Sequence, residues 1–129
     1  MSHYSRSAKY YKDQGIKTWK VEQPWNKFTK KRLDLFHIFD MIALNSGIVG
    51  VQVFGGSEMQ SHIQKLTVEH ADNTKEWLKC GGLAELHCWR QLKVKRGGKQ
   101  KVWKCQVVDI LLINNKLYTE ERENQSKQQ

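Results

Sequence analysis

The chain of 129 residues has little proline, little cysteine and no long apolar run. A single proline excludes a proline-rich linker. The three cysteines are loosely spaced and odd in number, so a disulfide framework is not expected and a reducing, cytoplasmic setting is. No stretch reaches the roughly 18 apolar residues of a membrane-spanning helix. The polar N-terminus also lacks the pattern of a secretory signal, so we expect no membrane partner.

Positive charge, in contrast, is in excess and unevenly placed. The 22 Lys and Arg residues against 13 Asp and Glu give a formal net charge of +9. Two basic blocks, residues 1–32 and 85–104, flank a mildly acidic centre. Such clusters are the electrostatic footprint of a polyanion-binding protein, most often one that binds nucleic acid. The alternative is a basic, solvated surface without a partner.

Hydrophobic periodicity predicts one α/β domain with a mixed sheet between helices, in the order α-β-β-β-α-β-β. The predicted elements are a helix over 2–14, strands over 16–22, 33–44 and 48–54, a helix over 57–80, and strands over 83–95 and 101–113. Residues 23–32 are predicted to form a basic loop. A capping box of Ser57 and Gln60 is predicted to begin the second helix. The domain then covers residues 1–118, and the polar residues 119–129 are predicted to be a frayed tail.

The central hairpin carries the first candidate site. A three-residue loop pairs Leu44 with Ile48, and the same register places Asp40 opposite Gln52. Opposed residues share a face, with Cβ atoms roughly 4.5–5.5 Å apart. A buried carboxylate is costly unless it is paired or binds a metal. With Glu22 on the preceding strand as a third oxygen donor, the group suits a hard cation such as Mg²⁺.

Other interpretations of these residues stay open at this point. Asp40 could instead form a salt bridge with a nearby Lys or Arg while Gln52 caps a backbone group. Asp34, six residues before Asp40, fits either the same strand face as a second acid or a salt bridge with Arg32, and the salt bridge is slightly favoured.

Three segments of this region form a pattern: Gly-Ile-Lys-Thr-Trp-Lys-Val-Glu, Asp-Leu-Phe-His-Ile-Phe-Asp-Met-Ile-Ala-Leu and Gly-Val-Gln-Val. Together they resemble the core of the PD-(D/E)XK nuclease superfamily, most closely its small Holliday-junction-resolvase-like and phage-type members. The resemblance covers about residues 2–90. It implies a restriction-endonuclease-like αβββαβ core with a central mixed sheet flanked by helices. It also implies an Mg²⁺-dependent endonuclease, with Mn²⁺ as an alternative ion, that hydrolyses DNA phosphodiester bonds at branched or junction DNA as a homodimer.

The resemblance also implies roles for individual residues. Asp40 matches the motif Asp that binds the metal, and Gln52 stands at the first position of the (D/E)XK element. Glu22 lies near the place where some members carry an extra acid. Gln52 in place of an acid lowers the negative charge available to the metal.

The motif lysine is missing, because Phe54 stands at its position. A cation from elsewhere would have to act in catalysis, and the candidates are Lys65 on the following helix and Arg90 on the next strand. The alternative is that the chain is a non-catalytic DNA-binding module on a degenerate nuclease core.

Basic residues in the loop and in the last hairpin are expected to bind the phosphate backbone of DNA without reading its sequence. They are Lys27, Lys30, Lys31, Arg32, Lys93, Lys95, Arg96, Lys99 and Lys101. Trp25, Phe28 and Trp103 lie among them, where they could stack on splayed bases.

Overall fold

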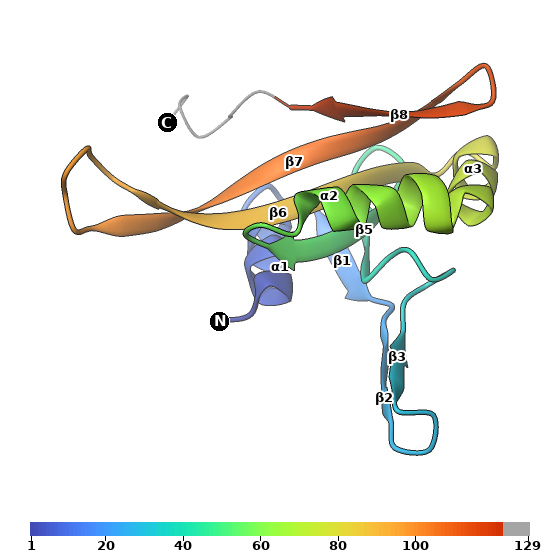
Figure 1. Cartoon of the computed structure of the whole chain (residues 1–129), viewed down its shortest axis with the longest axis horizontal. Helices are drawn as coiled ribbons and strands as arrows, with labels where there is room; N and C mark the ends of the chain where they lie inside the picture. Colours follow the sequence, from blue (N-terminus) through green and yellow to red (C-terminus); the bar gives the residue numbers. More distant parts are fainter. Residues whose placement is uncertain (123–129) are drawn as a thin grey trace.

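The computed structural model describes residues 1–122, which form an α/β fold around a six-stranded mixed sheet (Figure 1). The elements are α1 (His3–Lys12), β1 (Lys17–Lys20), β2 (Gln23–Asn26), β3 (Lys31–Leu33), β4 (Met41–Leu44), β5 (Ile48–Gly55), α2 (Met59–Gln64), the π-helical turn η1 (Lys65–Glu69), α3 (Ala71–Lys79), β6 (Leu83–Lys93), β7 (Lys101–Ile113) and β8 (Lys116–Glu121). The α/β class predicted from the sequence is confirmed. Among the described residues, no helix is both long enough and apolar enough to cross a membrane.

The sheet has the strand order β1-β4-β5-β6-β7-β8, and only β5 and β6 run parallel. Because side chains alternate between the faces of a strand, the sheet has two separate cores. One contains Met41 and Val51 with Tyr11 of α1, and the other contains Phe54 and Leu86 with Leu66 of η1. Helices therefore cover both faces, as the sequence predicts.

The central hairpin has the predicted register. Leu44 pairs with Ile48 and Ile42 pairs with Gly50. The paired residues end at Met41 with Val51. The backbone N–H of Asp40 donates to the carbonyl of Val51 at 2.9 Å, which is one residue out of the predicted register. The side chains of Asp40 and Gln52 nevertheless meet, since the Gln52 amide nitrogen lies 2.9 Å from Asp40 Oδ1.

The chain before this hairpin differs from the prediction in two places. Residues 23–33, predicted mainly as a loop, form the two-stranded sheet of β2 and β3. Residues 34–40, predicted as strand, form a tight turn closed by a bridge between Leu35 and Phe39. Two consecutive residues, Phe36 and His37, have positive φ values of 53° and 64°, which a strand cannot contain. The apolar residues Ile38 and Phe39 in this turn belong to the core. A run of apolar residues does not by itself distinguish a buried turn from a buried strand.

The predicted helix over 57–80 is divided into α2, η1 and α3. The capping box is wrong, since the helix begins at Met59 and its N-cap, Glu58, makes no side-chain capping bond. The turn that divides the helix begins at Lys65. Single π-helical turns inside helices often occur at functional sites.

The end of the described chain adds a strand that the prediction lacks. Asn114 and Asn115 have φ values of 51° and 63° and connect β7 to β8 as a two-residue hairpin loop. β8 continues to Glu121, so it includes residues 119–121 of the predicted tail. Residues 123–129 of that tail lie outside the described residues.

Candidate metal centre

Three carboxylates meet at the start of the central hairpin. One oxygen each from Glu22, Asp34 and Asp40 lie within 4.8 Å of one another. Glu22 follows β1, Asp34 follows β3 and Asp40 directly precedes β4. Asp40 is buried, at 8% exposure, while the other two are partly exposed. The cluster is therefore open to solvent on one side and anchored in the core on the other.

Asp40 is held by its backbone and by the packing of the residue before it. Its carbonyl accepts bonds from the N–H groups of Val21 and Glu22 at 2.9 and 3.2 Å, which tie the end of β1 to β4. The Phe39 ring lies over Gly50, where a Cβ would come within 2.5 Å of ring carbons. Only glycine admits the Phe39 ring at this place, and the buried ring sets the position at which the chain enters β4.

Gln52 and Lys65 connect the cluster to β5 and η1. The Gln52 amide nitrogen donates to both carboxylate oxygens of Asp40, at 2.9 and 3.0 Å. The Lys65 ammonium group donates to Asp34 Oδ2 at 2.8 Å and to Gln52 Oε1 at 3.1 Å. The backbone N–H of Val53 adds a third bond to Asp40, at 2.8 Å. The amide of Gln52 thus orients Asp40 and Lys65 rather than offering its oxygen beside Asp40.

The cluster has more negative charge than its neighbours balance. Burial and then the negative charge of Asp34 raise the pKa of Asp40 to about 7, with a smaller contribution from Glu22. Lys65 forms an ion pair with Asp34, and Arg32 lies 3.8 Å from Glu22. A divalent cation would supply the missing positive charge, and three carboxylates are the ligand type that Mg²⁺ prefers. The residues present therefore fit a hard divalent ion.

The structure brings together Asp40, Gln52, Glu22 and Lys65, four of the five residues proposed from the sequence for metal binding or catalysis. It does not bring Arg90 there. Arg90 is exposed on β6 opposite Lys104, four residues beyond the partner of Gln52.

Asp34 lies in the site because of a turn that the sequence did not predict. The slightly favoured salt bridge with Arg32 is not formed, because Arg32 lies beside Glu22 and Asp34 bonds to Lys65. The alternative, a second acid near Asp40, agrees with the structure, although not through strand periodicity. The tight turn of residues 34–40 folds Asp34 back towards Asp40. Two residues with positive φ are a signal that the sequence pattern does not display.

Phe54, at the position of the motif lysine, packs against His62 of α2. The two rings are parallel, with centroids 4.1 Å apart. Burial and the positive charge of Lys65 lower the pKa of His62, which favours its neutral form. Among the described residues, the buried Nδ1 of His62 has no hydrogen-bond partner. The apolar ring of Phe54 thus supports α2, the helix that leads to Lys65.

A second buried polar group lies on the opposite face of the sheet, under α1. His87 is fully buried, its Nδ1 is 2.9 Å from Ser7 Oγ, and its Nε2 is 3.0 Å from Glu85. Glu85 also accepts bonds from Tyr11 and from Arg122. The contacts run from Ser7 to His87 to Glu85, as in the triad of a hydrolase. However, Ser7 is 0% exposed, so no substrate can reach it. This group is part of the core.

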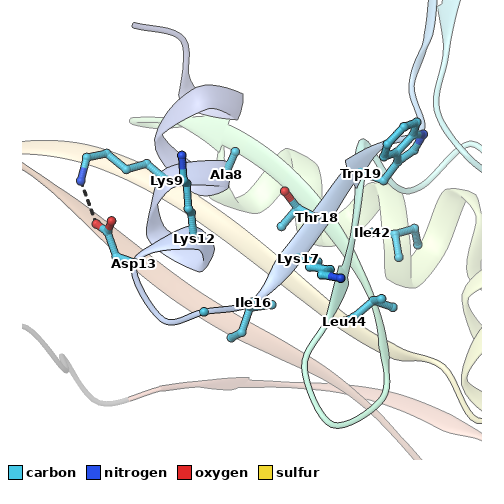
Figure 2. Close-up of a pocket in the computed structure, with 11 residues that line it drawn as sticks. Ala8, Lys9, Lys12, Asp13, Ile16, Lys17, Thr18, Trp19, Ile42 and Leu44 are labelled. Carbon is cyan, nitrogen blue, oxygen red and sulfur yellow. Dashed lines mark hydrogen bonds and ion pairs between the residues drawn. The ribbon is translucent and has the colours of Figure 1, made fainter.

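An apolar hollow lies between α1 and the edge strand β1 (Figure 2). Its lining includes Ala8, Ile16, Thr18 and Leu44, and its charged groups include the Lys9–Asp13 ion pair at 2.8 Å. None of the three clustered carboxylates lines it. The hollow is separate from the acidic cluster, and its one carboxylate, Asp13, is exposed and paired with Lys9.

The basic residues expected to bind phosphates are all exposed and lie in two places. The first group, Lys27, Lys30, Lys31 and Arg32, lies on the hairpin of β2 and β3, and the second group, Lys93, Lys95, Arg96, Lys99 and Lys101, lies at the far end of the β6–β7 hairpin. Figure 1 shows these hairpins projecting from the sheet in different directions. Trp103, on the second hairpin, is already covered by the Arg6 guanidinium at 3.6 Å.

Comparison of the chain with protein-family models, with curated proteins and with solved structures gave no match.

Proposed function

We propose that this protein is a metal-dependent endonuclease that hydrolyses DNA phosphodiester bonds, with branched or junction DNA as the substrate class that its resemblance implies. The observation that carries the proposal is the set of three carboxylates within 4.8 Å, linked through Gln52 to the ammonium group of Lys65. Carboxylates for a divalent ion and one cation for a phosphate are the groups that phosphodiester hydrolysis needs.

The topology around the site supports the same superfamily. α1 leads into β1, β4 and β5, and after the helical segment the chain returns as β6, parallel to β5. Leaving aside the β2–β3 hairpin, this is the αβββαβ order that the resemblance to PD-(D/E)XK nucleases implies. The restriction-endonuclease-like core is therefore part of our proposal.

The residues of the cluster divide into metal ligands and supporting groups in this mechanism. Asp40, Asp34 and Glu22 would hold the ion, and a divalent ion bound there would polarise a phosphoryl oxygen and lower the pKa of a water molecule. Gln52 keeps both oxygens of Asp40 oriented through its amide nitrogen.

Lys65 takes the role of the missing motif lysine. An ammonium group has three donors, and Lys65 uses two of them on Asp34 and Gln52. The third can donate to a phosphate oxygen, where a positive charge stabilises the negative charge that develops during hydrolysis.

A cleavage assay tests the proposal. Labelled single-strand, duplex, flap and four-way-junction DNA would be incubated with the protein in Mg²⁺, Mn²⁺ or EDTA, in parallel with Asp40→Asn and with the exposed-carboxylate control Asp13→Asn. We expect products that require a metal, persist in Asp13→Asn and disappear in Asp40→Asn. Unchanged cleavage by Asp40→Asn would refute the proposal.

The second candidate function is a DNA-binding module without catalysis. Gln52 and Phe54 favour it, since both replace motif residues that contribute to the reaction. It predicts salt-dependent DNA binding with no products in any metal, so the same assay separates the two functions.

A further inference from the structure

The β2–β3 hairpin, residues 23–33, stands apart from both cores of the protein. It forms a two-stranded sheet of its own, every residue in it is exposed, and it projects away from the main sheet (Figure 1). A lone two-stranded hairpin is marginally stable. Packing of the fold therefore gives no reason for large aromatic side chains on this hairpin, which we name the aromatic arm.

Two aromatic rings are nevertheless presented to solvent on the arm. Trp25 is 57% exposed and Phe28 is 85% exposed. The turn that carries Phe28 is already formed. Asn26 Oδ1 accepts bonds from the backbone N–H groups of Phe28 and Thr29 at 2.8 and 3.2 Å, and the N–H of Lys30 donates to the Asn26 carbonyl at 2.7 Å. A ring held on a preformed turn loses little conformational freedom on binding.

The positive charge of the arm indicates the chemistry of its partner. Residues 23–33 contain four Lys or Arg residues and no acid. Lys27 Nζ lies 5.3 Å from the centre of the Phe28 ring, so a ring and a cation share the tip. Exposed rings between cations suit single-stranded nucleic acid, whose bases stack on the rings while the phosphates contact the cations. In a continuous duplex the base faces are covered by their neighbours and cannot stack on a protein ring.

The arm is also the stretch of chain that joins two members of the acidic cluster. Glu22 directly precedes residue 23, and Asp34 directly follows residue 33. Arg32 on the arm lies 3.8 Å from Glu22, and the N–H of Glu22 donates to the Asp40 carbonyl at 3.2 Å. The base of the arm therefore lies at the carboxylates, and a strand that follows the arm from its tip to its base reaches them.

We propose that the aromatic arm binds unpaired nucleotides next to the phosphodiester bond that the acidic cluster cleaves, by stacking bases on Trp25 and Phe28. The inference rests on the proposed function and narrows its substrate to DNA with an unpaired segment at the cleavage position. Single strands, flaps and opened junctions belong to this class, and continuous duplex does not.

Binding measurements without cleavage test the inference. The full-length protein in EDTA would be titrated into fluorescein-labelled single-strand, flap and duplex DNA, with anisotropy as the readout. Trp25→Ala/Phe28→Ala is the test variant. Tyr118→Ala is the control, since it removes an exposed ring from β8 at the opposite edge of the sheet. Each stacked base contributes enough that we expect the double variant to bind single strands and flaps about 30-fold more weakly or worse. Its duplex affinity and the affinities of Tyr118→Ala should stay close to those of the unmodified protein.

The outcomes test binding by the aromatic arm independently of the proposed nuclease activity. Single-strand and flap affinities unchanged in Trp25→Ala/Phe28→Ala would overturn the inference, whether or not the protein cleaves DNA. Loss of those affinities in a protein that cleaves nothing in any metal would refute the proposed function and support the arm. Since both side chains are exposed, thermal unfolding should be unchanged. If it is not, Trp25→Leu/Phe28→Leu keeps the apolar bulk, removes the rings and should show the same loss.

Discussion

Two carboxylates are buried on opposite faces of the same sheet, and their surroundings act on them in opposite directions. Burial and the charge of Asp34 raise the pKa of Asp40 to about 7. Burial also opposes ionisation of Glu85, but the hydrogen bonds from His87 and Tyr11 outweigh it and lower the pKa of Glu85 to about 2. The two side chains are similarly hidden, at 8% and 3% exposure, so burial alone does not explain the difference.

The neighbouring charged and hydrogen-bonding groups explain why the two pKa values shift in opposite directions. Glu85 is bound by Arg122 at 2.6 Å, and the same guanidinium reaches Asp109, so β6, β7 and the end of the described chain are connected. Asp40 has other carboxylates as its neighbours, and the Lys65 ammonium bonds to Asp34. A buried acid with satisfied partners stabilises the fold. A buried acid among other acids either keeps its proton or binds a cation, and this property marks the acidic cluster as the candidate site.

The largest expected effects on cleavage and on stability come from replacing Asp40 and Glu85 by their amides. Asp40→Asn should lower metal-dependent cleavage by more than about 100-fold. Replacing a residue that only hydrogen-bonds to a metal ligand already lowers metal affinity or activity by roughly 10- to 100-fold, and Asp40 is proposed as a ligand itself. Asp40→Asn should leave the fold intact. Glu85→Gln should do the reverse, and lower the free energy of unfolding by on the order of 1–3 kcal/mol, because a neutral amide replaces the ionised acceptor that Tyr11 and His87 contact in the core. Urea unfolding and cleavage rates of both variants measure the two effects.

A Glu85→Gln protein of normal stability that no longer cleaves DNA would contradict this division of roles. So would an Asp40→Asn protein that unfolds much more readily than the unmodified chain at pH 8.

The next largest effect concerns the ammonium group in the cluster. Lys65→Met keeps much of the apolar stem and removes the charge, so cleavage should fall by roughly 10- to 100-fold, as for other groups that support a metal site. Lys79→Met, at an exposed position of α3, is the matched control and should cleave normally. Saturating DNA concentrations would show whether the loss lies in kcat, as expected for a group that stabilises developing charge. A loss confined to KM would assign Lys65 to DNA binding.

The pH dependence of stability should also distinguish the two faces. In the metal-free protein, folded Asp40 keeps its proton up to about pH 7, whereas the unfolded chain releases it near the ordinary value of 3.8. The folded state then holds more protons, so the free energy of unfolding should fall as pH rises from 5 to 8, by on the order of 1–3 kcal/mol. Glu85, with its lowered pKa, contributes stability that is lost only below about pH 4.5.

Urea unfolding in EDTA at several pH values between 5 and 8 measures this slope, and Asp40→Asn should flatten it. Addition of Mg²⁺ should restore stability at pH 8 more than at pH 5, because below pH 7 the ion must displace a proton. A slope that survives in Asp40→Asn would show that another group titrates.

The smallest effect is expected at the far end of the β6–β7 hairpin. Lys99→Ala/Lys101→Ala should weaken duplex binding only modestly and reduce the slope of log K against log salt by about 1.8, at about 0.9 per phosphate contact. Lys116→Ala, exposed on β8, should leave the slope unchanged. An unchanged slope in the double variant would remove this hairpin from the DNA-binding surface.

Local patterns were sufficient for the centre of the fold. The turn Asn45-Ser46-Gly47 between two β-branched runs predicts the hairpin, and its loop length predicts that Asp40 and Gln52 share a face. The α1 helix and the strands β6 and β7 follow in the same way, since each has a clear period and a turn signal at its end. These elements depend on neighbours in sequence.

Other features depend on contacts between distant residues. The turn of residues 34–40 has the composition of a strand, and distant residues contact it: Phe39 packs over Gly50, and the Asn73 amide donates to the Phe36 carbonyl at 3.0 Å. The sequence pattern does not predict β8, because its loop, Asn114-Asn115, has positive φ values without the glycine that usually marks such a hairpin. Its place in the sheet is set by pairing with β7 and by Arg122 reaching Glu85.

The sequence by itself determined the class of fold and the register of the central hairpin, because these follow from local periodicity and loop length. Only the tertiary structure decided that Asp34 rather than Gln52 completes the carboxylate cluster, and that Lys65 rather than Arg90 supplies the positive charge. The physical reason is that the turn of residues 34–40, with two positive φ values, folds Asp34 back towards Asp40, and that Lys65, at the start of the π-helical turn, bonds to Asp34 and Gln52 across the fold. Neither turn has a period that a sequence displays.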